Sequence, residues 1–206
     1  MTQPSLDLHR DFGDIDIYLF DQLLRGRIAT GMTVLDAGCG HGRNLVYLLR
    51  RGVDVRATDS SEVAVAAVRH LAAELAPTLA TDAFRAEPVE KMSFPNATFD
   101  VVISSAVMHF ARDEAHWTAM LDEMWRVLKP GGLFFARLAT TIGHEANVVL
   151  IGGRRYTLPD GSTRFLVDEE FIMTAAQRVG GTLEDPLKTS VVQGLRSMMT
   201  WVMRKA

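Results

Sequence analysis

The stretch VLDAGCGHGRN at residues 34–44 places three glycines at alternate positions directly after an apolar run. Glycine lets a backbone turn sharply and come close to a ligand, because it has no Cβ atom. We interpret the stretch as a loop from a strand into a helix that begins near Arg43, with helix amides that would attract negative charge. The alternative is a tight turn that binds nothing, although such a turn rarely needs three glycines.

Short apolar runs and segments of helical spacing alternate along the rest of the chain. This alternation predicts βαβ units, and therefore an α/β fold with a doubly wound, mostly parallel sheet that carries helices on both faces. Ser60 or Ser61 can cap the helix at 62–75, and KPGG predicts a turn at 129–132. The predicted strands cover residues 32–38, 53–59, 83–87, 99–107, 133–140 and 196–205, and the predicted helices cover 16–28, 42–52, 62–75, 114–128 and 168–181.

Length and composition limit the class of protein. A chain of 206 residues with 48% apolar and 23% charged residues fits one globular domain with a substantial core. The net charge of −3 argues against a nucleic-acid partner, which normally requires a basic face. Cys39 is the only cysteine, so no internal disulfide can form and a reducing, cytoplasmic location is expected. The polar, acidic N-terminus is unlike a signal peptide, and no apolar run reaches the length of a membrane span, which predicts a soluble protein.

The glycine spacing does not fit the two common phosphate-binding patterns. A dinucleotide loop reads G-x-G-x-x-G/A, and counting from Gly38 its last, small position falls on the long cation Arg43. Gly42 stands one residue too early for that role. No Gly-Lys-Ser/Thr follows, so the phosphate-loop pattern fails as well.

The stretch does resemble motif I of the class I S-adenosylmethionine-dependent methyltransferases, D/E-x-G-x-G-x-G, which stands here from Asp36 to Gly42. Asp59, at the end of the next predicted strand, matches the acidic residue that binds both ribose hydroxyls in that family. FPNATFDVVISSAVMHF and RVLKPGGLFF resemble the family's fourth strand and its turn into the fifth. The resemblance covers roughly residues 30–140, and Cys39 to Asn44 is also similar to methyltransferases of the tellurite-resistance type.

The resemblance implies a Rossmann-like sheet of seven strands whose last strand, at residues 196–205, is inserted antiparallel at the sheet edge. It implies S-adenosylmethionine as cofactor and S-adenosylhomocysteine as product. Many relatives carry an acidic residue at the adenine amino group where Pro88 stands here, so Glu87 or the backbone of Val89 is expected to replace it. Arg43 would pair with the methionine carboxylate or lie against Asp36. The cofactor-binding residues so implied are Asp36, Gly38, Cys39, Gly40, Gly42, Arg43, Asn44, Asp59, Ser60, Glu87, Val89 and Ser105.

The acceptor is expected to be a small molecule. Residues 104–108 lack the N/D-P-P-Y/F motif of adenine methylation, and the only cysteine lies in the glycine loop, which argues against cytosine methylation. His109 leaves the fourth predicted strand towards the cleft, where it could act as a general base or be a hydrogen-bonded scaffold residue. His109, Asp113 and His116 have the spacing of a helix surface, so no metal site is predicted.

Residues 140–171 are longer than a bare connection and carry a Pro-Asp-Gly turn signal between two predicted strands, Arg154 to Leu158 and Thr163 to Val167. We interpret them as a hairpin flap over the cleft, with a solvated hairpin as the alternative. Arg164 adds to the cationic and aromatic character of the flap, which suits an anionic or planar substrate. The predicted substrate-binding residues are Tyr18, His144, Arg154, Arg155 and Tyr156.

Together these features predict a single methyltransferase domain over residues 1–206, with a helical cap at 1–30, a cofactor-binding core at 31–140 and a flap with C-terminal strands at 141–206. It would move a methyl group to a thiol, oxyanion, hydroxyl or amine by in-line displacement. A non-catalytic S-adenosylmethionine-binding regulator and an NAD(P)-dependent oxidoreductase remain as alternatives. A monomer and a homodimer are both compatible with the sequence.

Overall fold

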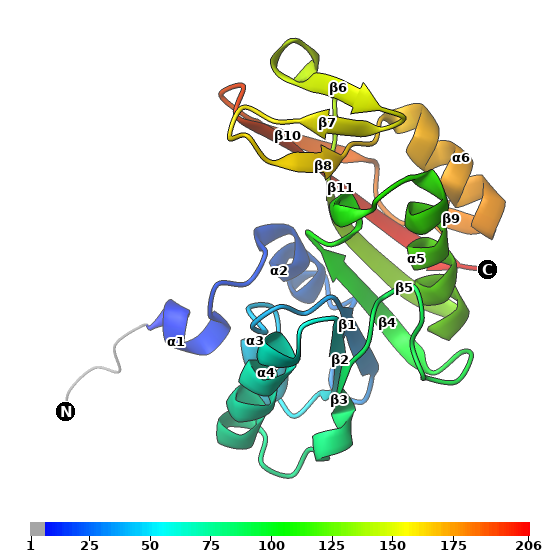
Figure 1. Ribbon diagram of the computed structural model, residues 1–206. Coiled ribbons are helices and arrows are strands. Elements are labelled where there is room, and N and C mark those ends of the chain that lie inside the picture. Colours follow the sequence, from blue (N-terminus) through cyan, green and yellow to red (C-terminus); the bar gives the residue numbers. More distant parts are fainter. Residues whose placement is uncertain (1–6) are drawn as a thin grey trace.

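The computed structural model describes residues 7–206, so the first six residues of the predicted cap, and of the stretch compared with a signal peptide, lie outside the described part of the chain. The main sheet has the strand order β10-β11-β5-β4-β1-β2-β3, and a short β9 also pairs with β11 (Figure 1). The strands are β1 (Thr33–Ala37), β2 (Asp54–Asp59), β3 (Phe84–Ala86), β4 (Phe99–Ser105), β5 (Leu128–Ala139), β9 (Gly181–Leu183), β10 (Lys188–Val192) and β11 (Arg196–Lys205).

The pairs from β3 to β5 are parallel, and β11 pairs antiparallel with β5, β9 and β10. This confirms the predicted α/β class, with seven strands along one path and β9 beside it. The expected position of the last strand is wrong, because β10 pairs with its far side and moves β11 into the sheet interior. The KPGG segment lies within β5 as a register irregularity against β4, and not as a separate turn before the strand.

Helices cover both faces of the sheet because successive strand residues point to opposite sides. In β1, Val34 packs into a core with α2, α3 and α4, whereas the neighbouring Leu35 packs into a core with α5 and α6. Ser61 caps α4 by accepting a hydrogen bond from the Ala64 amide at 3.3 Å. The helices are α1 (Leu8–Phe12), α2 (Ile17–Leu24), α3 (Val46–Arg50), α4 (Glu62–Leu75), α5 (Glu114–Val127) and α6 (Glu169–Val179), with short 3-10 turns η1 (Thr81–Ala83), η2 (Met108–Phe110) and η3 (Glu145–Asn147).

The flap is a small separate sheet of three antiparallel strands, β6 (Val149–Gly152), β7 (Arg155–Thr157) and β8 (Thr163–Phe165). The predicted hairpin corresponds to β7 and β8, and β6 is an addition that the sequence did not predict. Figure 1 shows the three strands in the order β6, β7, β8, with β6 at the top of the view. Within residues 7–206, no helix combines the length and the apolar character needed to span a bilayer.

Candidate active site

The glycine loop follows β1 and is held to the neighbouring strand by its backbone. The amides of Gly38 and Cys39 both donate to the carbonyl of Thr58 in β2, at 2.8 and 2.9 Å. After the loop, the Leu45 amide donates to the carbonyl of Gly42, and α3 begins only at Val46. The predicted helix start near Arg43 is therefore three residues early, because a turn comes first.

The three glycines of the loop all have positive φ, yet their surroundings differ. A Cβ atom on Gly38 would lie 2.6 Å from the Val107 side chain, and one on Gly42 would lie 3.1 Å from Val68 in α4. A Cβ atom on Gly40 would meet nothing within 4 Å, although this residue lines the central cavity. Gly38 and Gly42 thus permit close packing of the protein itself, whereas Gly40 leaves space for a ligand.

Asp59, the last residue of β2, links the loop to the start of α4. One oxygen of its carboxylate accepts from the Gly40 amide and the other accepts from the Ser61 amide, each at 2.9 Å. A carboxylate offers about four acceptor positions, so roughly two remain for a ligand. Asp59 also lines the cavity, so its free positions can be reached from there.

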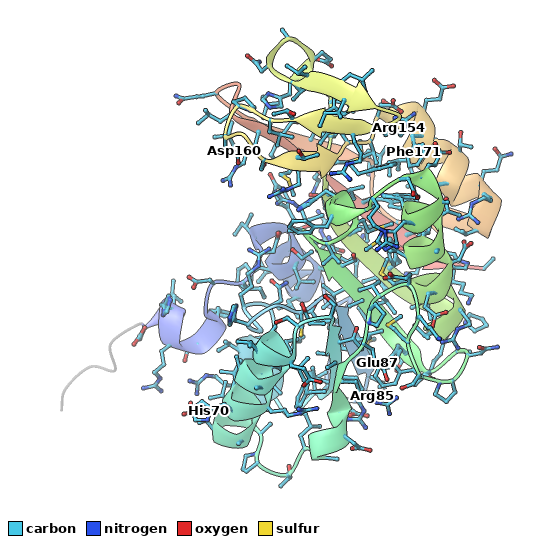
Figure 2. All side chains as sticks on the ribbon, in the orientation of Figure 1. His70, Arg85, Glu87, Arg154, Asp160 and Phe171 are labelled. Atoms are coloured by element: carbon cyan, nitrogen blue, oxygen red, sulfur yellow. The ribbon has the colours of Figure 1, made fainter. Side chains whose placement is uncertain are left out.

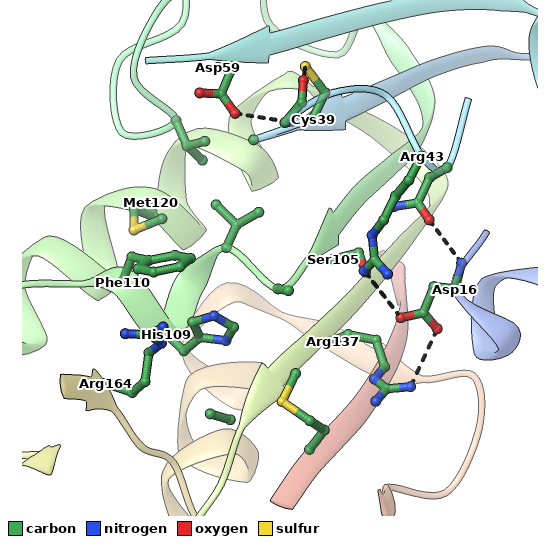
Figure 3. A pocket seen from close by; sticks show the side chains of 18 of the residues that line it. Asp16, Cys39, Arg43, Asp59, Ser105, His109, Phe110, Met120, Arg137 and Arg164 are labelled. Atoms are coloured by element: carbon green, nitrogen blue, oxygen red, sulfur yellow. Dashed lines mark hydrogen bonds and ion pairs between the residues drawn. The ribbon is translucent and has the colours of Figure 1, made fainter. Parts of the chain in front are cut away.

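A cavity of about 1420 Å³ lies at the carboxyl ends of β1, β2 and β4, which is where open α/β sheets bind ligands. Ligand pockets for one small molecule are typically about 300–1,000 Å³, so this cavity has room for a cofactor and a second molecule. One half is lined by the glycine loop, and the other half by η2, β5, β11 and the flap (Figure 3). The predicted cofactor-binding residues that line it are Gly38, Cys39, Gly40, Arg43, Asn44, Asp59, Ser60, Val89 and Ser105.

Three predicted cofactor-binding residues do not line the cavity. Gly42 packs against α4, and Glu87 is turned away because its carboxylate accepts hydrogen bonds from the amide and hydroxyl of Ser93. Asp36 is fully buried beneath the loop, and this burial raises its pKa to about 7 despite the nearby positive charge of Arg43. Burial also raises the pKa of the Cys39 thiol, so this cysteine stays protonated.

Asp16, at the start of α2, joins the two halves of the cavity, a role that no local pattern in the sequence indicates. Its amide donates to the side chain of Asn44 at 3.0 Å, and its carboxylate accepts from the Ser105 hydroxyl at 3.2 Å. The guanidinium groups of Arg137 and Arg43 lie 3.4 and 3.7 Å from the same carboxylate (Figure 3). Arg43 therefore pairs with Asp16, a partner that the sequence did not indicate, and its charge also acts on the buried Asp36. A pairing of Arg43 with the methionine carboxylate stays a prediction.

His109 lies in η2, is buried, and lines the half of the cavity that is formed by η2, β5, β11 and the flap. We call it the acceptor half, because the sequence predicts the methyl acceptor there. Burial, together with the positive charge of Arg164, lowers its pKa to about 4. Its Nδ1 atom is buried without a hydrogen-bond partner. The ring is therefore neutral at physiological pH and has unused hydrogen-bonding capacity.

None of the five predicted substrate-binding residues lines the cavity. Tyr18 bonds to the hydroxyl of Ser190, and His144 is buried. Arg154 contacts the start of α6, where it pairs with Asp168 at 2.8 Å and lies over the ring of Phe171 (Figure 2). Arg155 and Tyr156 belong to β7, which lies further from the cavity than β8.

The flap instead contributes residues from β8 and from the turn before it. The sequence indicated Arg164 only through its charge. Most of the other residues that line this half of the cavity were not predicted, because they come from separate segments of the chain. A metal site was not predicted, and among residues 7–206 no group of three His, Cys, Asp or Glu side chains has a metal-binding arrangement. The unpredicted lining residues with polar or bulky side chains include Asp16, His41, Phe110, Arg137, Leu158, Asp160, Ser162, Arg196 and Met198.

The fold is a Rossmann-like α/β domain, and the glycine loop after its first strand lines a cavity at the carboxyl ends of the strands. Residues 34–132 match the family model described as "Methyltransferase domain". This part of the chain, just under half of it, is therefore similar to methyltransferase domains.

Among curated proteins, the chain is 28% identical over 137 residues to the ubiquinone biosynthesis O-methyltransferase of Mesorhizobium japonicum, covering 66% of this chain and 53% of that protein. The chain spans about half the length of the curated relatives that it matches. Among solved structures, it resembles protein PH0226 of Pyrococcus horikoshii, with TM-score 0.72, 21% identity and coverage of 92% and 89% of the two chains. It also resembles 1,6-didemethyltoxoflavin-N1-methyltransferase of Burkholderia thailandensis, solved with S-adenosylhomocysteine, with TM-score 0.70, 20% identity and coverage of 97% and 81%.

Proposed function

We propose that the protein is an enzyme that transfers a methyl group from S-adenosylmethionine to a small-molecule acceptor. The observation that carries this proposal is the pairing of Gly40 and Asp59. Gly40 has open space where a Cβ atom would stand, and the Asp59 carboxylate beside it keeps free acceptor positions in the cavity wall. This combination suits a ribose whose two hydroxyl groups donate to one carboxylate.

The other cofactor contacts are assigned by the same reasoning. Ser60 lies beside Asp59 at the ribose, and Val89 offers its backbone to the adenine in place of the acidic residue that Pro88 replaces. Arg43, Asn44 and Ser105 would hold the methionine end, together with Gly38 and Cys39. Asp36 and Gly42 support the loop from beneath and do not touch the cofactor in this proposal.

When bound, S-adenosylmethionine would supply a methyl group activated by its positively charged sulfur. The acceptor's lone pair would bond to the methyl carbon as the carbon–sulfur bond breaks, and S-adenosylhomocysteine would remain. The protein's task is then to hold the acceptor in line and to exclude water. The flap and the start of α2 are suited to that task, because both line the cavity. We divide the chain accordingly into a cap at 1–30, a cofactor-binding core at 31–140 and an acceptor side at 141–206.

His109 acts in this proposal as a neutral hydrogen-bonding residue that orients the acceptor. With a pKa near 4 it is a weak base, and an acceptor that arrives as an anion needs no base. A strong general base would have a pKa closer to the working pH. The protein would work in the cytoplasm, in keeping with its single, buried cysteine.

The size of the cavity favours an enzyme over the alternative of a non-catalytic regulator. A regulator needs to enclose only S-adenosylmethionine, whereas this cavity of about 1420 Å³ continues past the glycine loop to His109 and the flap. The glycine spacing argues against the second alternative, an NAD(P)-dependent oxidoreductase.

Incubation with S-adenosylmethionine labelled on its methyl group and a panel of thiols, phenols, amines and carboxylates tests the proposal. We expect label in at least one acceptor with the parent protein and none with Gly40→Val. Binding of S-adenosylhomocysteine without transfer to any acceptor class would favour the regulator.

A further inference from the structure

Four arginines line the acceptor half of the cavity, and they differ in how their charge is balanced. Arg112 lies 3.9 Å from Glu90, and Arg137 lies 3.4 Å from Asp16. Arg164 and Arg196 have no carboxylate within 4 Å among residues 7–206. Arg196 is exposed at the cavity mouth, whereas Arg164 is half-buried in the wall formed by β8.

The position of Arg164 makes it the better anchor for an anion. Its guanidinium lies 4.6 Å from the centre of the Phe110 ring, and one amino group donates to the carbonyl of Thr163 at 2.8 Å. A guanidinium carries five N–H donors, so most of its donors remain unused. Asp160 also lines the wall, and Ser162 and the charge of Arg164 lower its pKa, but its carboxylate is exposed, is more than 4 Å from the guanidinium and accepts from the Ser162 amide. Such a partly desolvated cation binds carboxylates with charge-assisted, bidentate hydrogen bonds.

The surfaces around this guanidinium are apolar and aromatic. Phe110 lines the cavity with 59% of its surface exposed, so its ring can be reached by a ligand. Val107, Ala139 and Met198 form further apolar parts of the lining. Figure 3 shows Arg164 beside both His109 and Phe110. A flat ring suits this wall, because aromatic rings pack on one another and on guanidinium planes.

Two residues that line the same half each carry a buried polar atom without a hydrogen-bond partner. The Nε atom of Arg137 and the Nδ1 atom of His109 are buried without hydrogen-bond partners. Buried polar groups are normally satisfied, so an ordered water or a small side-chain movement is expected to complete these two.

We propose that the acceptor is a small aromatic carboxylic acid, whose carboxylate is bound by Arg164 and whose ring lies against Phe110. This inference rests on the proposed function, since it names the substrate class of the same cavity. Arg164 is then the residue that determines specificity for an acid over the matching neutral compound. The acidic group of the acceptor, and not the methyl-accepting atom, is what Arg164 recognises.

The test compares benzoate with benzamide, which differ in charge but share the ring, by calorimetry on protein saturated with S-adenosylhomocysteine. We expect benzoate to bind at least about tenfold more tightly than benzamide, a difference typical of a charge-assisted hydrogen bond. Arg164→Gln should abolish that preference without changing the affinity for S-adenosylhomocysteine. Arg164→Lys should restore part of the preference, because it returns the charge without the planar fork.

Arg155→Gln is the matched control, because Arg155 lies on the adjacent strand β7 and does not line the cavity. It should leave both affinities unchanged. Benzoate binding no more tightly than benzamide, including no binding of either, would overturn the inference. A preference for benzoate that survives in Arg164→Gln would also overturn it. Equal losses of affinity for benzoate and benzamide in that variant would do the same, because Arg164 would then only pack against Phe110. Failure of S-adenosylhomocysteine to bind would instead overturn the proposed function, so the two failures can be told apart.

Discussion

The two halves of the cavity are built in different ways. The cofactor half is formed largely by the backbone of one continuous loop, residues 38–42, together with the carboxylate of Asp59. The acceptor half is formed by side chains from α2, η2, β5, β8 and β11, which are far apart in the chain. The cofactor half therefore depends on local backbone conformation, whereas the acceptor half depends on long-range packing and on ion pairs.

The largest expected effect tests whether the loop backbone makes the cofactor half. Gly40→Val should abolish detectable binding of S-adenosylhomocysteine, because a branched side chain would fill the ligand space and resist a φ of +53°. Gly52→Val is the control, since Gly52 also has positive φ (+67°) and open space, but lies outside the cavity. Gly52→Val should lower the free energy of unfolding by a similar amount and leave the affinity for S-adenosylhomocysteine unchanged. Unchanged affinity in folded Gly40→Val would show that the loop does not approach the ligand.

The second prediction tests whether charge holds the acceptor half together. Asn caps a helix nearly as well as Asp, so Asp16→Asn keeps the cap of α2 but leaves Arg43 and Arg137 without their shared carboxylate. We expect a loss of about 2–3 kcal/mol in the free energy of unfolding, below the range for a fully buried pair because Arg43 is half exposed. Denaturant titration measures this loss.

Asp113→Asn is the matched control, because Asp113 caps α5 through the His116 amide and has no arginine partner within 4 Å among residues 7–206. It should change the unfolding free energy by less than about 0.5 kcal/mol. If the two variants lose the same amount, the ion pairs around Asp16 contribute nothing measurable.

The third prediction separates the ribose contact of Asp59 from its structural contacts. Asp59→Asn should weaken binding of S-adenosylhomocysteine by about 1.5–3 kcal/mol, the range for hydrogen bonds to a charged group. Ser61→Ala should lower stability by about 1 kcal/mol through loss of the α4 cap, while leaving cofactor affinity unchanged. Calorimetry decides between the two roles: an Asp59→Asn affinity within about twofold of the parent would remove the ribose contact from the account.

The smallest expected effect concerns the electrostatics of the acceptor half. Since burial and Arg164 lower the pKa of His109 to about 4, its ring should titrate near that pH in the folded protein. The unfolded chain takes up this proton near pH 6.5, so the stability that His109 contributes is present above about pH 6.5 and is lost as the pH falls towards 4. Arg164→Gln removes a positive charge and should raise this pKa, which NMR titration of the ring measures. A pKa unchanged in this variant would mean that Arg164 does not act on His109.

The sequence predicted the fold well where the pattern was local. The helix at 62–75 and the strand at 196–205 match the structure at both ends, because continuous periodicity and a serine cap define them. The strand KTSVV was missed, since five residues of mixed polarity carry little signal. The edge position of residues 196–205 was expected from the family resemblance, and pairing with KTSVV overturns it. The start of α3 was predicted near Arg43 but lies at Val46, because the residues of the turn at 42–45 are also compatible with a first helical turn.

The same contrast applies to the site. The glycine loop and Asp59 could be identified because their spacing is fixed by one strand and one helix. Asp16 could be recognised as a helix cap, but nothing local indicates that two arginines from other elements meet its carboxylate. Arg154, Arg155 and Tyr156 were chosen by residue type, and the pairing of three flap strands, which sets β8 and not β7 against the cavity, was not readable from the sequence.

The central claim is that this cavity binds an S-adenosyl cofactor, and ligand titration of the parent protein tests it most directly. S-adenosylmethionine and S-adenosylhomocysteine should each bind and raise the melting temperature, with a stabilisation that grows as the logarithm of ligand concentration over Kd, whereas NAD should do neither. Binding of NAD with no response to either S-adenosyl ligand would contradict the account.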